Sequence, residues 1–234
     1  MQTDIRSFPN AVGSAEAVRS FLQRVYIWMT GGLVLTGVIA FQVASSETLF
    51  RAIVLNQGLF LTLIFAELGI VMAMSFMINR VSTAVAGGMF IAYSALNGLT
   101  LSVVLLAYTA ESVAQTFFIT AGMFGGMSLY GYATKKDLTS MGSFMMMGLL
   151  GLILTMVVNM FLQNAAISYA ISLIGVIIFV GLTAYDTQKL KNIALQHSDM
   201  TESSDKPAIY GALTLYLDFI NLFLMLLRLF GKRR

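Results

Sequence analysis

The fold class of this chain follows from one stretch, ISLIGVIIFVGL at residues 171–182. The run is continuously apolar or small, whereas a strand of a transmembrane barrel would alternate apolar and polar residues over ~10 positions. A transmembrane helix needs ~20 mostly apolar residues. Seven segments of that kind can be delimited, at residues 26–45, 56–78, 83–107, 112–133, 141–162, 167–187 and 209–230. The sequence therefore predicts an all-α polytopic membrane protein with seven transmembrane helices.

The composition agrees with that interpretation and excludes several classes of protein. Apolar residues make up 58% of the 234 residues and charged residues only 11%, about half of the ~25% typical of soluble domains. Mean hydropathy is +0.82. An ordinary soluble enzyme and a disordered chain are thereby excluded. The chain has no Cys and one His, which excludes a disulfide scaffold and thiolate or His-cluster metal sites.

The chain divides into a polar N-terminal segment at residues 1–25, a single transmembrane domain at 26–231 and a basic tail at 232–234. The first segment is too polar for a cleaved signal peptide. Residues 14–25 are compatible with an amphipathic helix or with a solvated lead-in to the first span. The apolar face of such a helix would consist of Val18, Phe21, Leu22 and Val25.

Basic residues favour a cytoplasmic N-terminus, because Lys and Arg are enriched in cytoplasmic loops. With that orientation nine basic residues lie inside and five outside. The inside set is Arg6, Arg19, Arg24, Arg80, Lys135, Lys136, Lys189, Lys191 and Lys206. Seven crossings put the tail at 231–234 outside, whereas one re-entrant segment would put it inside. We favour seven crossings.

Ionisable residues at membrane depth are the strongest functional signal in such a chain. Asp186 lies near the end of the sixth span, Asp218 lies within the seventh, and Arg80 marks the inner end of the second. At ~1.5 Å per residue, Asp186 is expected about 5–8 Å and Asp218 about 10–14 Å inside the inner membrane boundary. Glu67 should lie about 20 Å deeper than Arg80. The sequence thus predicts two carboxylates and a guanidinium in one leaflet.

Helical spacing predicts a polar stripe on each of the last two spans. Thr183 shares a face with Asp186, while Thr214 and Asn221 share a face with Asp218. Such stripes should turn away from lipid, towards each other or towards a water-filled path. The GxxxG pattern of Gly122 and Gly126, in contrast, predicts close packing between helices.

Two facing carboxylates at low dielectric cannot both ionise cheaply, so Asp186 and Asp218 should titrate as a coupled pair. That makes a proton-responsive latch, which Arg80 could oppose. Together with neighbouring oxygens the pair could hold Ca²⁺ weakly and transiently. The alternative is a protonated Asp that joins the two helices for structural reasons alone.

Glu67 and His197 carry weaker signals. Glu67 is expected to pair with Asn97, Thr100 or Ser102, or to line the outer part of an ion path. His197 lies in a polar loop at 192–208, together with Asp199, Glu202 and Asp205, and we interpret this loop as solvated.

Two strings carry a family resemblance. GLTAYDTQKL at residues 181–190 and GALTLYLDFINLFLMLLR at 211–228 together resemble the last two helices of the Bax inhibitor (transmembrane Bax-inhibitor-motif) family, most of all its bacterial inner-membrane branch. Residues 93–101 and 121–136 extend the resemblance over nearly the whole chain. The resemblance implies a bundle around a central seventh helix, a multi-pass protein of the bacterial inner (plasma) membrane, and a pH-sensitive calcium leak.

The resemblance also implies roles for individual residues. Asp186 in the YD motif and Asp218 in the LYLDF motif match an aspartate pair that gates the leak. Arg80 matches a latch position on the second helix, and Glu67 resembles an acid of that same helix. The loop between the two aspartates is longer than in compact relatives, which puts loop-dependent gating in doubt.

We therefore expect a calcium or cation leak channel without a cofactor, which is not an enzyme. Its partners would be the lipid bilayer, calcium ions and protons, and not nucleic acid. One alternative is a non-catalytic regulator that binds other membrane proteins, such as a membrane-anchored quality-control protease. A minor alternative is an intramembrane aspartyl protease. Tyr185 and Asp186 match the first half of that motif, but Asp218 lacks the preceding glycines.

Overall fold

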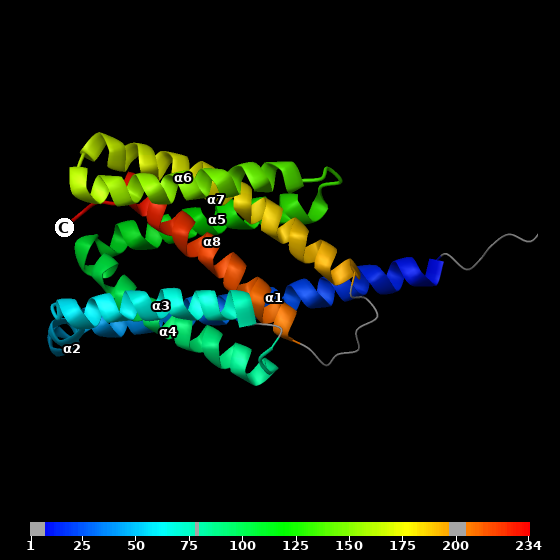
Figure 1. Ribbon diagram of the computed structural model, residues 1–234, viewed down its shortest axis with the longest axis horizontal. Coiled ribbons are helices and arrows are strands. Elements are labelled where there is room, and N and C mark those ends of the chain that lie inside the picture. The colour runs from blue at the N-terminus through cyan, green and yellow to red at the C-terminus, as the bar shows by residue number, and fades with distance from the viewer. Residues whose placement is uncertain (1–7, 78–79, 197–204) are drawn as a thin grey trace, which may run out of the picture.

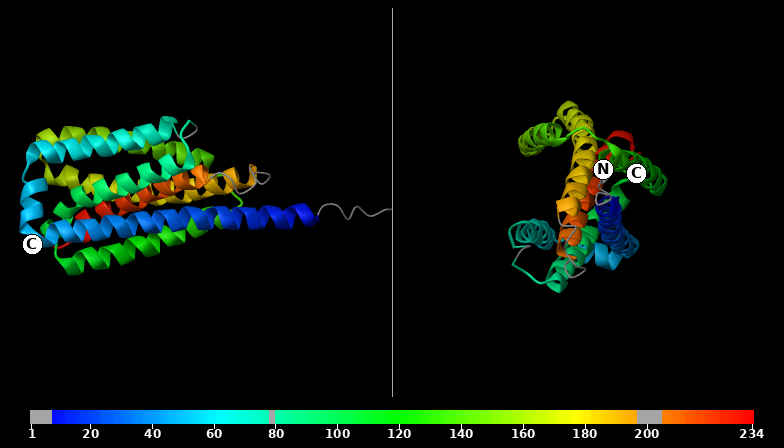
Figure 2. Two further views of the ribbon diagram at one scale, coloured as in Figure 1. Left: turned by 90° about the horizontal axis from the view of Figure 1, so that it is seen from below. Right: turned by 90° about the vertical axis from the view of Figure 1, so that its right-hand side faces the viewer.

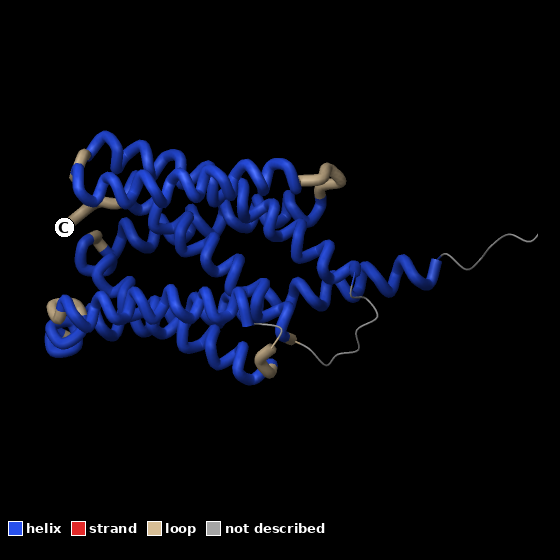
Figure 3. The backbone as a smooth tube through the Cα atoms, viewed as in Figure 1, coloured by secondary structure: helices blue, strands red, loops and turns tan. Residues whose placement is uncertain are grey.

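Each apolar run predicted to cross the membrane forms a helix. The computed structural model describes residues 8–77, 80–196 and 205–234, with side chains from residue 15 onward. Figure 1 shows the helices, and Figure 3 shows that the described connections between them, drawn in tan, are short. The helices are α1 (Phe8–Ser45), α2 (Glu47–Ile53), α3 (Gln57–Met77), α4 (Thr83–Ala107), α5 (Ala110–Ala133), α6 (Thr139–Leu162), α7 (Ala165–Gln196) and α8 (Lys206–Phe230).

Six of these helices are long and apolar enough to cross a membrane by length and composition. They are α1, α3, α4, α6, α7 and α8. The remaining long helix, α5, has 24 residues, but its glycine, tyrosine and hydroxyl residues make it less apolar. The prediction of a helical membrane protein is thus confirmed, while the seventh crossing stays a prediction.

The N-terminal part of α1 is the amphipathic helix that the sequence allowed. One helix runs through the expected boundary at residues 25 and 26. Val18, Phe21, Leu22 and Val25 are all buried in the main core. This apolar face docks the start of α1 onto the bundle, and the alternative of a solvated lead-in is wrong.

A short helix, α2, forms where the sequence analysis expected only a connection. The Ser46 side chain caps its first turn by accepting a hydrogen bond from the Leu49 N–H. Arg51 and Glu47 form an exposed ion pair at 2.7 Å, one turn apart. Seven residues with two charges are too few and too polar to register as a span.

Helix α8 lies between two groups of helices. Helices α1, α3 and α4 lie on one side of it in Figure 1, and α5, α6 and α7 lie on the other. It contacts α1, α4, α5 and α7 and is the most deeply buried of the apolar helices. The end-on view in Figure 2 shows α7 and α8 crossing near the middle of the molecule. Residues on α8 can therefore contact both groups.

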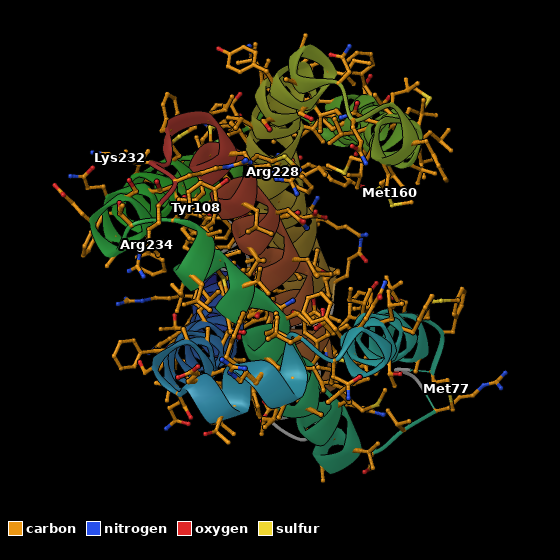
Figure 4. All side chains as sticks on the ribbon, turned by 90° about the vertical axis from the view of Figure 1, so that its left-hand side faces the viewer. Met77, Tyr108, Met160, Arg228, Lys232 and Arg234 are labelled. Carbon is orange, nitrogen blue, oxygen red and sulfur yellow. The ribbon has the colours of Figure 1, made fainter. Side chains whose placement is uncertain are left out.

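Both ends of α8 are attached to turns of the chain. At its start, Lys206 Nζ donates to the Val81 carbonyl oxygen at 3.1 Å. At its end, the Thr109 N–H donates to the Lys232 carbonyl oxygen at 3.0 Å. Figure 4 shows Lys232 and Arg234 beside Tyr108 in the α4–α5 turn. The basic tail thus lies at the opposite end of the bundle from the α3–α4 turn.

Glycines bring two helices close to α7. A Cβ at Gly131 of α5 would collide with the Ala184 carbonyl group, and a Cβ at Gly142 of α6 would collide with the Tyr185 ring. By contrast, Cβ atoms at Gly122 and Gly126 would meet no described atom within 4 Å. The GxxxG prediction is therefore wrong within this chain, because these two glycines face away from the helices.

Candidate functional site

The aspartates predicted to form a pair do meet. Asp186 on α7 is 6% exposed and Asp218 on α8 is 5% exposed. The two carboxyl groups lie within hydrogen-bonding reach of each other. The α7–α8 contact that brings them together also includes the close packing of Leu190 against Gly211. We call Asp186 and Asp218 the aspartate pair.

The aspartate pair has few other partners. No N–H or O–H donor of the described residues reaches the buried Oδ2 of Asp218. A hydrogen bond between two carboxyl groups requires a proton on one of them. The ion pairs of the described residues join Arg24 to Asp205 and Arg51 to Glu47, so neither aspartate has a salt-bridge partner there. A proton on one carboxyl group would let Asp186 and Asp218 hydrogen-bond to each other.

The predicted supporting residues share the helices of the aspartate pair, but none of their hydrogen bonds goes to it. Thr183, Thr214 and Asn221 each donate to the carbonyl oxygen four residues earlier in their own helix. Tyr185 packs its ring on Gly142. The hydrogen bonds of Thr183, Thr214 and Asn221 stay within their own helices, so these residues are not seen to donate to the carboxyl groups.

Thr187 is a neighbour that the sequence analysis missed. This fully buried residue follows Asp186 directly and donates to the Thr183 carbonyl oxygen at 2.8 Å. Its hydroxyl group also lies 3.3 Å from the Ser128 hydroxyl group of α5. The contact links α5 to α7 beside the aspartate pair. A threonine in an apolar run carries no spacing signal that would have revealed it.

Each aspartate lies further from the end of its helix than Lys189 and Lys191 suggested, although its depth in the membrane stays a prediction. Helix α7 continues for ten residues beyond Asp186, to Gln196, which is about 15 Å of helix. Asp218 lies twelve residues after the start of α8, or about 18 Å along it. The two lysines therefore do not mark the end of the helix, and residues 192–196 are not a loop.

Arg80 is not brought to the aspartate pair. It lies in the α3–α4 turn with an exposed side chain and forms no ion pair with a described residue. Lys206 at the start of α8 contacts Val81, the next residue to Arg80, whereas Asp218 lies about 18 Å further along α8. An ion pair requires about 4 Å or less between nitrogen and oxygen. The predicted latch contact is therefore absent from this conformation of the described residues.

Glu67 forms a separate polar site on the other side of α8. Thr100 Oγ1 donates to Glu67 Oε1 at 2.8 Å, and Asn97 Nδ2 donates to Glu67 Oε2 at 3.2 Å. Two of the three predicted partners are thus confirmed. Ser102 instead donates to the Leu99 carbonyl oxygen. Glu67 is consequently a carboxylate with two donors.

The Glu67 site extends through α8 to α1. The Tyr216 hydroxyl group donates to Asn97 Oδ1 at 3.1 Å and lies 2.6 Å from Thr36 Oγ1. Thr36 is also 2.8 Å from the Ser94 carbonyl oxygen of α4. These groups connect four helices through buried and half-buried hydrogen bonds, which we call the Glu67 network. The sequence analysis did not identify Thr36 or Tyr216 as members.

The charged groups outside the spans do not join either site. Asp205 precedes α8 and forms a half-exposed ion pair with Arg24 at 3.3 Å. The Thr139 hydroxyl and N–H groups donate to Asp137 and hold the pKa of that exposed carboxyl group below its usual value. His197, Asp199 and Glu202 lie outside the described residues.

Comparison with known proteins identifies the family. Residues 18–234 match the family described as inhibitor of apoptosis-promoting Bax1, or Bax1-I. The chain belongs to this family. The Bax inhibitor resemblance is thereby confirmed, and the protein is a membrane protein of the Bax inhibitor family.

Relatives match over nearly their whole length. The inner membrane protein YbhL of Escherichia coli strain K12 is 51% identical over 219 residues, which cover 93% of each chain. An uncharacterized protein of Deinococcus radiodurans is 45% identical over 218 residues, again 93% of each chain. Uncharacterized protein RP147 of Rickettsia prowazekii is 45% identical over 94% of this chain and 92% of its own.

Proposed function

We propose that this Bax inhibitor family protein is a pH-sensitive leak channel for Ca²⁺ or similar cations, with the aspartate pair as its gate. The observation that carries the proposal is the buried contact between Asp186 and Asp218. Neither carboxyl group forms an ion pair with a described residue, although the charge of Lys189 on the same helix acts on Asp186. A buried polar pair that lacks external partners is costly in a membrane protein and is usually functional.

The gate responds to pH through electrostatic repulsion. With one shared proton, the two carboxyl groups hold α7 and α8 together. Loss of that proton leaves two negative charges at contact distance in a low dielectric, where their repulsion is strong. The contact is therefore present at lower pH and weakens as pH rises through the ionisation of the pair. Separation of α7 from α8 at the aspartate pair would open the proposed cation path along α8.

Ca²⁺ is the proposed cargo and not a resident cofactor. The ionised pair offers up to four carboxylate oxygens, fewer than the 6–8 oxygen ligands that Ca²⁺ takes. The described residues contain no cluster of three or more acidic, His or Cys side chains. Water must supply the missing ligands, so binding is weak and transient. Weak binding suits an ion that has to leave again.

The topology belongs to the same proposal. We propose that α5 makes the seventh crossing, because its 24 residues lie beside α7 and α8 for the length of the bundle. Helix α8 is then the central seventh span. By the excess of basic residues, the N-terminus is cytoplasmic, and by the relationship to YbhL the membrane is the bacterial inner membrane.

Arg80 and Glu67 have secondary roles in this proposal. Arg80 can approach the aspartate pair only after α3 or α8 shifts, so its latch function belongs to another conformation. Glu67 is held by Asn97 and Thr100 and lines the opposite side of α8. We propose no catalytic function, since Asp218 lacks the glycine motif of intramembrane aspartyl proteases.

Calcium flux into liposomes tests the proposal. Purified protein is reconstituted with a trapped calcium dye, and influx is measured from about pH 6 to 8, because a coupled pair of carboxyl groups changes charge with pH. We expect a pH-dependent flux that Asp186→Asn or Asp218→Asn alters. Folded protein that gives no flux above empty liposomes at any pH would overturn the leak and favour a regulator that binds other membrane proteins.

A further inference from the structure

A long groove lies between α1 and α5 and takes no part in the proposed gate. Its volume is about 1,090 Å³, at the upper end of the ~300–1,000 Å³ of small-molecule sites. Helices α1 and α5 both pack on α7 and α8, and Phe219 of α8 lies in the groove. The groove is therefore a lateral opening between two helices of the bundle.

The middle of the groove is apolar and free of obstruction. Its walls include Met29, Leu33 and Val38 of α1 and Phe124 and Leu129 of α5. Glycines widen it, because Cβ atoms added at Gly37 or Gly125 would meet no described atom within 4 Å. An apolar groove with glycine in its walls has the shape to accept a hydrocarbon chain.

One end of the groove is polar and basic. Arg19, Gln23, Tyr26 and Tyr132 line this end. Arg19 is exposed and forms no ion pair with a described residue. Lys191 lies against Tyr132, with Nζ 2.7 Å from its carbonyl oxygen and 5.3 Å from the ring centre. An arginine and two tyrosines in the lining, with a lysine next to one of these tyrosines, suit an anionic headgroup at the membrane interface.

The dimensions fit one leaflet of a bilayer. The α1 wall advances by twelve residues from Tyr26 at the polar end to Val38, or about 18 Å. One leaflet contributes half of a hydrocarbon core ~30 Å thick. The basic mouth then lies at headgroup level. The groove thus matches a phospholipid, whose charged headgroup would lie at the basic end and whose acyl chain would lie along the apolar part.

We propose that this groove is a specific binding site for one anionic phospholipid of the surrounding bilayer. Arg19 binds the phosphate, with Lys191 beside it, and an acyl chain lies along α1 and α5 over Phe219. The site differs from ordinary lipid contact in having a groove for the chain and cations for the headgroup. It is independent of calcium flux.

Lipid retention tests the site. The full chain is placed in vesicles of equal phosphatidylglycerol and phosphatidylcholine, extracted in mild detergent, and the retained lipid is measured by mass spectrometry. We expect phosphatidylglycerol to be enriched over phosphatidylcholine. Arg19→Gln should lower that enrichment at least about tenfold, the effect of losing one hydrogen bond to a charged group. Arg80→Gln, which removes an exposed cation at the α3–α4 turn, should leave it unchanged.

A second pair of variants tests the groove itself. Gly125→Leu fills the groove, whereas Gly122→Leu puts the same side chain on α5 outside its walls. Neither meets a described atom at Cβ, so both should fold, as thermal melting can verify. Retention should fall in Gly125→Leu only. Equal retention of the two lipids by the wild type, equal loss in both leucine variants, or a dimer that only Gly125→Leu disrupts would overturn the proposal.

Discussion

Two buried polar side chains of α8 face opposite sides of the helix. One has all its hydrogen-bond partners, and the other has a buried oxygen atom without a donor. Tyr216 and Asp218 are two residues apart, which is about 200° around the helix. Tyr216 contacts Thr36 and Asn97 at hydrogen-bonding distance. Asp218 faces Asp186, and its buried Oδ2 has no donor among the described residues. One helix thus carries a complete hydrogen-bond network on one side and an incomplete one on the other.

The difference separates a structural carboxylate from a switchable one. Glu67 receives two donors that do not change charge with pH, so its contacts survive a change of pH near neutrality. In the proposed gate, the contact between Asp186 and Asp218 depends instead on a proton shared by the two carboxyl groups. The lesson is that burial alone does not mark a functional acid. The nature of its hydrogen-bond partner does.

Replacing either member of the aspartate pair should have the largest effect. An Asn amide donates to the remaining carboxylate without any proton from solvent. In Asp186→Asn and Asp218→Asn the helix contact should therefore persist at all pH values, and the pH dependence of calcium flux should disappear. Distances between spin labels on α7 and α8 should likewise stop responding to pH.

Glu67→Gln is the matched control for that experiment. It makes the same change of carboxylate to amide on the other side of α8, so the pH dependence should remain. If Glu67→Gln removes the pH response and the aspartate variants keep it, the two sites have been assigned the wrong way round.

Gly131→Ala should be the most damaging small change on the Asp186 side. Its Cβ would collide with the Ala184 carbonyl group, which no rotamer change can relieve. Overpacking of this kind costs about 1–3 kcal/mol. Gly126→Ala on the same helix meets open space and should stabilise the protein by about 0.4–1 kcal/mol. Unfolding in mixed micelles compares the two, and equal stability would contradict the close α5–α7 contact.

Tyr216→Phe should weaken the Glu67 network modestly. The variant keeps the edge-to-face ring contacts with Phe90 and Tyr93 but removes the hydroxyl group between Thr36 and Asn97. Hydrogen bonds between membrane helices average roughly 0.6 kcal/mol and buried ones in general about 1 kcal/mol. The loss of unfolding free energy should fall in that range, with the pH response of flux intact. A lost pH response would show that the two sides of α8 are coupled.

Arg80→Ala should have the smallest effect on stability. Its side chain is exposed and has no ion pair among the described residues, and such substitutions usually change stability by less than about 0.5 kcal/mol. Its effect on flux should be smaller than that of either aspartate variant. A loss of stability above 1 kcal/mol would mean that Arg80 is paired in the resting protein.

The spans and the aspartate pair could be predicted because their signals are local. The fourth helix of the structure has the bounds expected from its apolar run, Thr83–Ala107. Asp186 and Asp218 were predicted to meet because consecutive helices tend to pack together and a carboxylate avoids lipid. A charged residue within an apolar run can be recognised as a candidate functional residue from the sequence alone.

The parts that were missed depend on tertiary contacts. Lys189 and Lys191 suggested the end of a span, but α7 continues because Leu190 and Ala194 are buried against the core. Thr36 and Tyr216 could not be assigned to the network from the sequence, since a hydroxyl group can instead hydrogen-bond to the backbone of its own helix. Arg80 was expected near the aspartates from its depth in the membrane and from the latch position of the family resemblance. Depth does not give the distance across a bundle.

Attachment of α8 at both ends determines which helix can move. Its start is bonded to the α3–α4 turn through Lys206. Its end is bonded to the α4–α5 turn by the main chains of Lys232 and Arg234. Sliding α8 along its axis would break both attachments, so in the proposed gate we expect α7 to tilt against α8. A reporter fused directly after Arg234 could disturb the hydrogen bonds of the tail to the α4–α5 turn. A fusion at the N-terminus is therefore the better choice for recording a movement of α7 against α8.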